Sequence, residues 1–260
     1  MNRDLLRQAV NLAALVFALA VNGLAEAIPL NGQTSAQIAN RLPILFVPAN
    51  YVFSIWGVIY VFMIGFGIYQ ALPSQRENSA LRRIGYWFAL SCLANGVWLI
   101  LFHYDQFPLS MVAMIVLLVS LIIIYTRVGV GLAAVKGGMK WWVHTTFSIY
   151  LGWITVATVA NAAYVLFDAK WDGLGISPEL WTIALLLVAT GLTLAFIYIR
   201  RDVAYTMVIL WALVGIVVKQ SATPSVAIAS AMMVLIIIVA LVLKLWIGRQ
   251  PGHPLVASPA

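Results

Sequence analysis

One segment of the sequence carries side chains that can stack on a ligand and hydrogen-bond to it. Residues 150 to 161 read YLGWITVATVAN, an apolar run that also holds aromatic rings and an amide. At helical spacing, Tyr150, Trp153, Ala157 and Asn161 fall on one face. Indole rings provide large rigid surfaces with one N–H donor each, so this face suits a flat or aromatic apolar molecule. The small side chain of Ala157 leaves room for such a molecule on this face.

Two further segments repeat this pattern. Phe53, Trp56 and Tyr60 share one helical face, and Asn95 lies one turn from Trp98 on another. A buried amide within a membrane must pair either with a neighbouring helix or with a ligand. Each asparagine alone is explained by helix pairing, but the clustering of mid-span tryptophans with both asparagines favours a ligand site.

The elements that must position these side chains are membrane-spanning helices. The chain has 260 residues, of which 63% are hydrophobic and only 9% charged. Its apolar runs have roughly the 20 residues that cross a hydrocarbon core about 30 Å thick. We therefore expect an all-α polytopic membrane protein with about eight transmembrane helices, at residues 8–28, 49–72, 84–104, 108–127, 141–167, 179–199, 203–220 and 224–247.

The basic residues predict how these helices are oriented. The net charge is +7, but the basic side chains stand singly or in pairs at span ends, so they report topology and not nucleic-acid binding. With a cytoplasmic N-terminus, only Arg41, Lys170 and Lys219 lie outside. The inside segments hold the other twelve: Arg3, Arg7, Arg76, Arg82, Arg83, Arg127, Lys136, Lys140, Arg200, Arg201, Lys244 and Arg249. The sequence thus predicts a multi-pass protein of the cell membrane with both termini in the cytoplasm.

The first apolar segment has two interpretations. Its basic start and the Ala25-Glu26-Ala27 tripeptide resemble a signal peptide with its cleavage site. The apolar run is long, however, and Glu26 and Pro29 are unusual around a cleavage site, so we expect a retained first helix.

The longest loops suggest how the chain is organised. Residues 29–48 follow the first span, and at about 1.5 Å per residue the mid-span aromatic residues lie roughly 9 to 21 Å below that side of the membrane. This loop is therefore a candidate lid. The loop at 168–178 separates spans rich in tryptophan and asparagine from spans of Leu, Ile, Val and Ala. We predict a five-helix domain at residues 1–170 and a three-helix extension with a short cytoplasmic tail at 171–260.

Three motifs resemble the TspO/MBR family, also called tryptophan-rich sensory proteins or translocator proteins. Residues 150–161 resemble its fifth-helix pattern, residues 95–98 its Asn-x-x-Trp, and residues 48–60, PANYVFSIWGVIY, the start of its second helix. The likeness covers residues 8–168. Its paired prolines are reduced here to Pro48, and Ile149 stands where a proline precedes the fifth-helix tyrosine.

The resemblance implies a five-helix fold that binds porphyrins or other aromatic ligands below the first extramembrane loop. By resemblance, Trp56, Asn95, Trp98, Trp153, Ala157 and Asn161 occupy the pocket positions. Phe53, Tyr60 and Tyr150 lie on the same faces and complete the predicted site. A porphyrin or haem-like tetrapyrrole is the expected ligand, and no cofactor is required.

The sequence offers no catalytic or metal-binding arrangement. His103, His144 and His253 are too scattered to bind a metal together, and no Ser/His/Asp or Cys/His set or phosphate-binding glycine loop is present. We therefore expect no enzyme, but a sensor or carrier of a hydrophobic aromatic ligand, with the extension as a partner or homodimer surface. The alternatives are a small-molecule permease that uses all eight helices and a membrane scaffold without a ligand.

Overall fold

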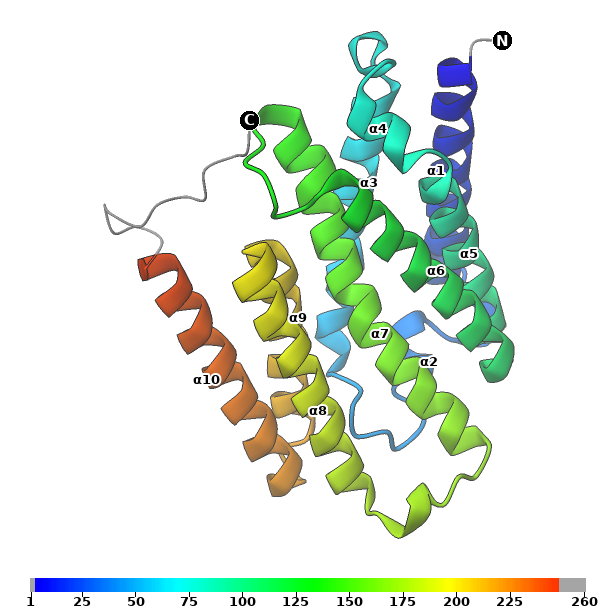
Figure 1. Cartoon of the computed structure of the whole chain (residues 1–260). Helices are drawn as coiled ribbons and strands as arrows, with labels where there is room; N and C mark the ends of the chain where they lie inside the picture. Colours follow the sequence, from blue (N-terminus) through cyan, green and yellow to red (C-terminus); the bar gives the residue numbers. More distant parts are fainter. Residues whose placement is uncertain (1–2, 248–260) are drawn as a thin grey trace.

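The computed structural model describes residues 3–247, and these residues form helices and loops with no β-strand. Arg249, His253 and the predicted cytoplasmic tail lie outside the described residues. Residues 3–247 form eight long helices, which run in alternating directions (Figure 1). They are α1 (Arg3–Ala27), α3 (Ile55–Ala71), α5 (Trp87–His103), α6 (Phe107–Val128), α7 (Thr146–Asp168), α8 (Pro178–Ala195), α9 (Val203–Lys219) and α10 (Pro224–Ile247).

Short elements join or extend these helices. They are α2 (Ser35–Ala39) and α4 (Ser79–Ile84), the 3₁₀ turns η1 (Leu30–Gly32), η2 (Asn50–Ser54), η3 (Pro73–Gln75) and η5 (Gly173–Gly175), and the π-helical turns η4 (Met139–Thr145) and η6 (Phe196–Arg200). The π-turn η4 continues directly into α7, and η6 continues α8.

The all-α polytopic membrane fold predicted from the sequence is confirmed. Within the described part of the chain, six segments are long and apolar enough to cross a membrane: those of α1, α6 and α10, and those of α3, α7 and α8 with their adjoining 3₁₀ or π turns. The other two apolar helices, α5 and α9, have 17 residues each. At 1.5 Å per residue, 17 residues span about 26 Å, close to the thickness of a hydrocarbon core.

Local sequence signals set the helix ends. The chain leaves α6 at Gly129, which has a φ of +69°, a conformation that glycine adopts without steric cost. The Ser177 side chain accepts a hydrogen bond from the Leu180 amide at the start of α8, and Pro178 fills the first turn. At the start of α9 the Asp202 carboxylate accepts the Tyr205 amide. Capping residues thus mark the end of α6 and the starts of α8 and α9.

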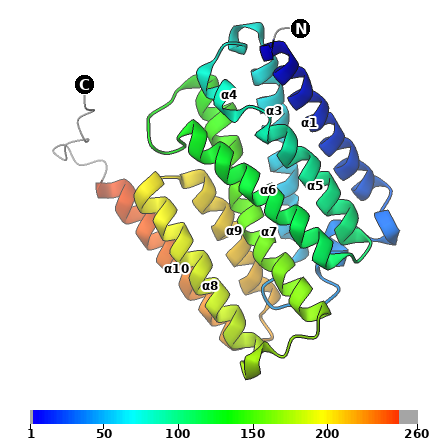
Figure 2. The same ribbon diagram turned by 45° about the vertical axis from the view of Figure 1, so that its right-hand side comes forward.

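The helices fall into two packed groups. Helices α1, α3, α5, α6 and α7 form a five-helix bundle, and α8, α9 and α10 lie along one side of it (Figures 1 and 2). The predicted boundary near residue 170 falls in the loop between α7 and α8. Helix α9 packs on α7 and on the segment before α3, and one buried apolar cluster runs through both groups.

Asp202 connects the two groups at a buried position. One of its carboxylate oxygens caps α9, and the other accepts hydrogen bonds from Tyr125 Oη of α6 at 2.8 Å and Ser148 Oγ of α7 at 2.7 Å. The residue is only 6% exposed. Three helices therefore meet at one side chain.

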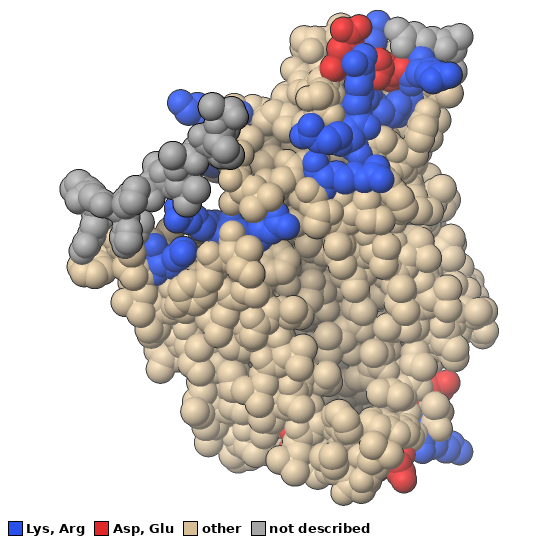
Figure 3. Space-filling view, viewed as in Figure 1, with Lys and Arg blue, Asp and Glu red and all other residues tan. Residues whose placement is uncertain are grey.

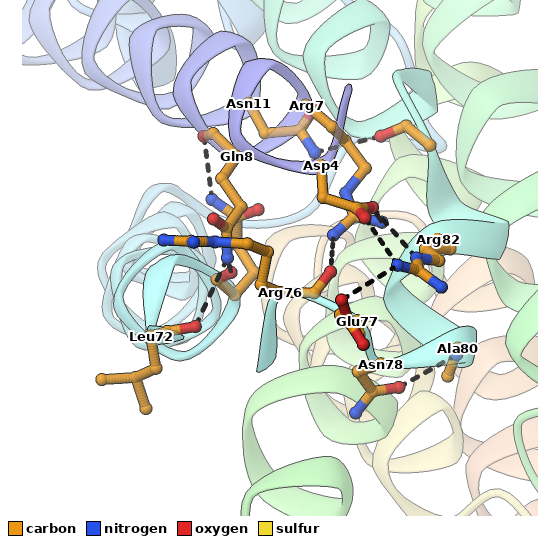
Figure 4. Close-up of polar contacts among 12 residues, drawn as sticks. Asp4, Arg7, Gln8, Asn11, Leu72, Arg76, Glu77, Asn78, Ala80 and Arg82 are labelled. Atoms are coloured by element: carbon orange, nitrogen blue, oxygen red, sulfur yellow. Dashed lines mark hydrogen bonds and ion pairs between the residues drawn. The ribbon is translucent and has the colours of Figure 1, made fainter. Parts of the chain in front are cut away.

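Basic side chains gather at the end of the molecule where α1 begins, which we call the basic end (Figure 3). Polar contacts tie α1 to the end of α3 and to residues 72–86 there (Figure 4). Gln8 Nε2 donates to Gln70 O at 2.7 Å, Asn11 Nδ2 to Gly85 O at 3.0 Å, and the Arg82 guanidinium pairs with Asp4. These bonds fix the register of α1 against its neighbours. The opposite end, which holds the loop between α1 and α3, we call the lid end.

Candidate functional site: an aromatic cage under the lid segment

A small cavity lies in the lid-end half of the five-helix bundle. It opens between α3, α5 and α7, and residues 28–54, which we call the lid segment, cover it. Its volume is about 40 Å³. The lining residues are Ser35, Ala39, Val47, Pro48, Phe53, Trp56, Trp98, Phe102, Trp153, Val156, Ala157, Ala160, Asn161 and Tyr164. Within the described chain, none of them comes from α8, α9 or α10.

Aromatic rings surround this cavity, and we call six of them the aromatic cage: Phe53, Trp56, Trp98, Phe102, Trp153 and Tyr164. The Trp56 ring lies 6.3 Å from that of Trp98 in a stacked arrangement and 6.2 Å from that of Trp153 in an edge-to-face one. Phe53 meets Trp153 edge-on at 5.7 Å. These are the ring separations at which aromatic pairs attract each other, so the closed cage is stabilised by contacts among its own rings.

Asn161 is the polar centre of the cage. Its Oδ1 accepts hydrogen bonds from Trp98 Nε1 at 2.7 Å and from Ser110 Oγ at 3.2 Å. Its Nδ2, however, has no acceptor among the described residues, and neither does Trp153 Nε1. Both side chains line the cavity and are only 2% exposed. Two side chains of the cavity wall therefore each carry a buried N–H without an acceptor in the described part of the chain.

Six of the nine predicted site residues line the cavity, and three lie behind it. Phe53, Trp56, Trp98, Trp153, Ala157 and Asn161 are in the wall. Of the other three, Tyr60 stacks on Trp56 at 5.6 Å, and Tyr150 meets Trp56 edge-on at 6.2 Å. Asn95 contacts α1, where its Oδ1 accepts from Asn22 Nδ2 at 2.6 Å.

Asn22 holds these supporting residues together. Its Oδ1 accepts a hydrogen bond from Tyr60 Oη at 2.7 Å, while its Nδ2 bonds Asn95. Helices α1, α3 and α5 are thus joined by one buried polar chain directly behind Trp56. Sequence reasoning missed Asn22, although an asparagine within the apolar run 8–28 was a signal for such a contact.

The lid-segment residues of the wall were also missed. Ser35, Ala39, Val47 and Pro48 line the cavity, but they lie in a stretch with no helical or strand periodicity that could assign them a face. Only the position of this loop next to the aromatic helices suggested that it covers them.

Hydrogen bonds and an ion pair attach the lid segment to the five-helix bundle. Tyr164 Oη of α7 donates to Ile38 O at 2.6 Å, and Asn31 Nδ2 donates to His103 O at 3.0 Å. Arg41 forms an ion pair with Asp105 in the short loop between α5 and α6, and this contact raises the pKa of Arg41. The first half of the lid segment is therefore fixed to α5, to the loop after it and to α7.

The second half of the lid segment is held by α9. The Ala49 amide donates to Gly215 O at 3.1 Å, Trp211 Nε1 donates to Val52 O at 3.1 Å, and Gln220 Nε2 donates to Leu45 O at 3.0 Å. Lys219 Nζ reaches Asn40 Oδ1 in addition. The C-terminal helices thus do not line the cavity but hold the segment that covers it.

Helix topology, an aromatic cage and a covering segment together define a polytopic helical membrane protein with a buried aromatic site. The family model described as TSPO-like protein matches residues 8–243, which includes the C-terminal helices down to most of α10. The chain belongs to the TSPO-like protein family, which confirms the resemblance found in the sequence. Searches of curated proteins and of solved structures returned no match.

Proposed function

We propose that the protein binds a tetrapyrrole, such as a porphyrin, or a similar hydrophobic aromatic ligand in the aromatic cage, and that it acts as a sensor or carrier of that ligand and not as an enzyme. Membership of the TSPO-like family supports the general class of membrane sensor or binding protein. In this proposal the indole rings stack on the ligand, and Asn161 and Trp153 bind its polar groups.

The unpaired donors of Trp153 and Asn161 carry this proposal. A buried N–H without an acceptor costs about 1–3 kcal/mol, and a ligand oxygen within reach would offset that cost. An aromatic ligand with carbonyl or carboxylate oxygens suits both the rings and the donors. A porphyrin with acidic side chains is such a ligand.

Ligand binding requires the cage to open. The cavity of about 40 Å³ is far below the roughly 300–1,000 Å³ of sites for drug-sized ligands. The described structure therefore corresponds to a closed state, and the lid segment, or the rings below it, must move to admit a tetrapyrrole. A sensor could report this movement through α9, which contacts the lid segment directly.

The wall composition favours binding within the five-helix bundle over a permease path through all eight helices. Every described lining residue belongs to the lid segment, α3, α5 or α7. In this proposal α8, α9 and α10 stabilise the closed state and present a surface to a partner or a second copy of the chain.

The distribution of charge supports a cytoplasmic basic end with both termini inside. Lysine and arginine side chains crowd that end in Figure 3, as expected for loops retained in the cytoplasm. Labelling of intact cells with a membrane-impermeant thiol reagent tests this orientation. Ile176→Cys, at the lid end, should react, and Ser74→Cys, at the basic end, should not; the reverse pattern would invert the topology.

A titration of the purified protein with protoporphyrin IX tests ligand binding. We expect tryptophan fluorescence to fall along a saturable curve, and an unlabelled aromatic competitor to reverse it. Quenching that rises linearly and is equal in an unrelated membrane protein would mean that the porphyrin only partitions into detergent. Counterflow of labelled ligand in proteoliposomes then separates a carrier from a sensor.

A further inference from the structure

A second and larger hollow lies outside the cage, between α7 and α8. Its volume is about 440 Å³, within the range of roughly 300–1,000 Å³ typical of ligand sites. Figure 3 shows a hollow on the face where Figure 1 places these two helices. We call it the α7–α8 groove. Its walls are Thr158, Val159, Ala162, Ala163, Leu166 and Phe167 of α7, residues 43–46 of the lid segment, and residues 171–185 in part.

The walls of the groove are mostly apolar and are complementary to a hydrocarbon chain. Three of their four hydroxyl and indole donors are already paired: Thr158 Oγ1 with Ile154 O at 2.7 Å, Thr182 Oγ1 with Pro178 O at 2.8 Å, and Trp181 Nε1 with Gly173 O at 2.8 Å. The fourth, the Trp171 indole, has no acceptor among the described residues, but Trp171 is 39% exposed. Between these paired donors a ligand gains nothing by presenting polar groups, and it loses their hydration. This contrasts with the cage, where two donors are unpaired.

The shape of the groove suits an extended chain. Its α7 wall runs from Thr158 to Phe167, which at 1.5 Å per residue is about 14 Å along the helix axis. The small side chains of Ala162 and Ala163 leave the groove open along this wall. The groove faces the apolar outer surface of two membrane-spanning segments, where Leu166 and Leu187 are exposed. In a bilayer the molecules beside this surface are lipids.

The lid-end rim of the groove is amphipathic. Trp171 and Trp181 form a ring pair at 5.2 Å, as is common at the depth of lipid headgroups. Next to them, the exposed Asp168, Lys170 and Asp172 place both signs of charge within five residues. A headgroup that itself carries a cation and an anion is the best complement to such a rim.

We propose that the α7–α8 groove binds one acyl chain of a zwitterionic phospholipid, whose headgroup lies at the Asp168–Asp172 rim. The site is separate from the cage, because it uses the neighbouring face of α7 and residues 43–46 in place of Val47 and Pro48. The bound chain would pack against the outer side of the lid segment. It would fill space that the protein leaves open, and so stabilise the contact between the two helix groups.

Native mass spectrometry of the whole protein tests the proposal. The protein is taken from nanodiscs that hold equimolar phosphatidylethanolamine and phosphatidylglycerol, with detergent added until loosely bound lipids are lost. We expect one phosphatidylethanolamine to remain on the wild type. Ala162→Phe fills the groove and should reduce that adduct to the background of non-specific binding. Ala184→Phe, on an exposed position of α8 outside the groove, should retain it.

Two further arms keep the test decisive. Ala162→Leu is a smaller plug that reports on the groove if the phenylalanine variant does not fold, and it too should lose the lipid. Equal lipid retention in the wild type and the plugged variants would overturn the proposal, as would retention of no lipid at all. Preferred retention of phosphatidylglycerol, or a retained mass that is not a phospholipid, would overturn the assignment of a zwitterionic lipid.

Discussion

Trp153 and Asn161 hold the two polar atoms on which the proposed ligand site depends. Both donors are buried and neither has an acceptor among residues 3–247. The oxygen of the Asn161 amide accepts the Trp98 Nε1 hydrogen bond at 2.7 Å, and Ser110 Oγ lies 3.2 Å from it. The bond from Trp98 fixes the orientation of the amide, while its nitrogen has no acceptor within the described chain.

Trp153→Phe should weaken porphyrin binding without unfolding the protein. The indole N–H makes no bond in the closed state, so its loss breaks no hydrogen bond of the protein, and the phenylalanine ring keeps part of the packing against Phe53 and Trp56. A hydrogen bond contributes about 0.5–1.5 kcal/mol, so we expect the dissociation constant to rise roughly twofold to tenfold. Fluorescence titration measures it, and Trp246→Phe, at the exposed end of α10, is the matched control. An unchanged affinity would remove Trp153 Nε1 from the site.

Tyr164→Phe should make the lid segment open more often. The substitution deletes the hydrogen bond to Ile38 O and keeps the ring in the cage wall. Because the closed, ligand-free state loses about 0.5–1.5 kcal/mol, the association rate of the ligand should rise by a factor of about 2 to 10. The dissociation rate should change little, because the lid segment is already displaced in the bound state. Stopped-flow fluorescence checks this, with Tyr198→Phe at an exposed position of η6 as control. An association rate equal to that of the wild type would show that Tyr164 does not restrain the lid segment.

At the scale of elements, α9 determines whether the lid segment stays in place. Gly215 allows the close approach: a Cβ there would collide with Val52 Cγ2 and lie 3.0 Å from Pro48 Cβ. Its carbonyl also accepts the Ala49 amide. The second half of the lid segment is thus packed on α9 through a residue without a side chain.

Gly215→Ala should loosen this contact. Overpacking in a close interface costs about 1–3 kcal/mol, so the protein should unfold at lower temperature and residues 44–54 should exchange amide hydrogens faster. Gly191→Ala is the control, because a Cβ there meets nothing within 4 Å. If both alanine variants melted and exchanged alike, α9 would not be restraining the lid segment.

Asp202→Ala should separate the two helix groups. The change removes the cap of α9 and leaves the buried Tyr125 and Ser148 hydroxyls without their acceptor, a combined loss of about 2–4 kcal/mol in the free energy of unfolding. Asp202→Asn keeps an acceptor oxygen and should lose less. Asn78→Ala removes the cap of the short helix α4 at the basic end and is the control. The measurement is thermal unfolding in detergent, and an Asp202→Ala variant that unfolds at the same temperature as Asn78→Ala would count against this role of Asp202.

The helices were predictable from the sequence, whereas the lid segment was not. Apolar runs of about 20 residues have one stable form in a bilayer, since a helix satisfies its own backbone hydrogen bonds. The five-residue α2 has no such signal, and its surroundings include Lys219 and Gln220, far away in sequence. The aromatic residues that share one helical face predicted which sides of α3, α5 and α7 meet. They could not show that Tyr60, Asn95 and Tyr150 support the cage from behind.

At the scale of the whole molecule, the two ends of the bundle differ in chemistry. The basic end is held by charged and amide contacts to backbone carbonyls, and the lid end holds the cage and the segment that covers it (Figures 3 and 4). Helix α9 reaches both ends, through its cap Asp202 at one and through Trp211 and Gln220 at the other. It thus acts as a brace along the five-helix bundle, and α10 packs on α9 and α8.

A crystal structure of the protein grown with protoporphyrin IX tests the central claim most directly. We predict the tetrapyrrole between Trp56, Trp98 and Trp153, with an oxygen within hydrogen-bonding distance of Asn161 Nδ2 or Trp153 Nε1 and the lid segment displaced from its position over the cavity. A porphyrin bound in the α7–α8 groove or on the outer surface, above a cage that is still closed, would contradict it.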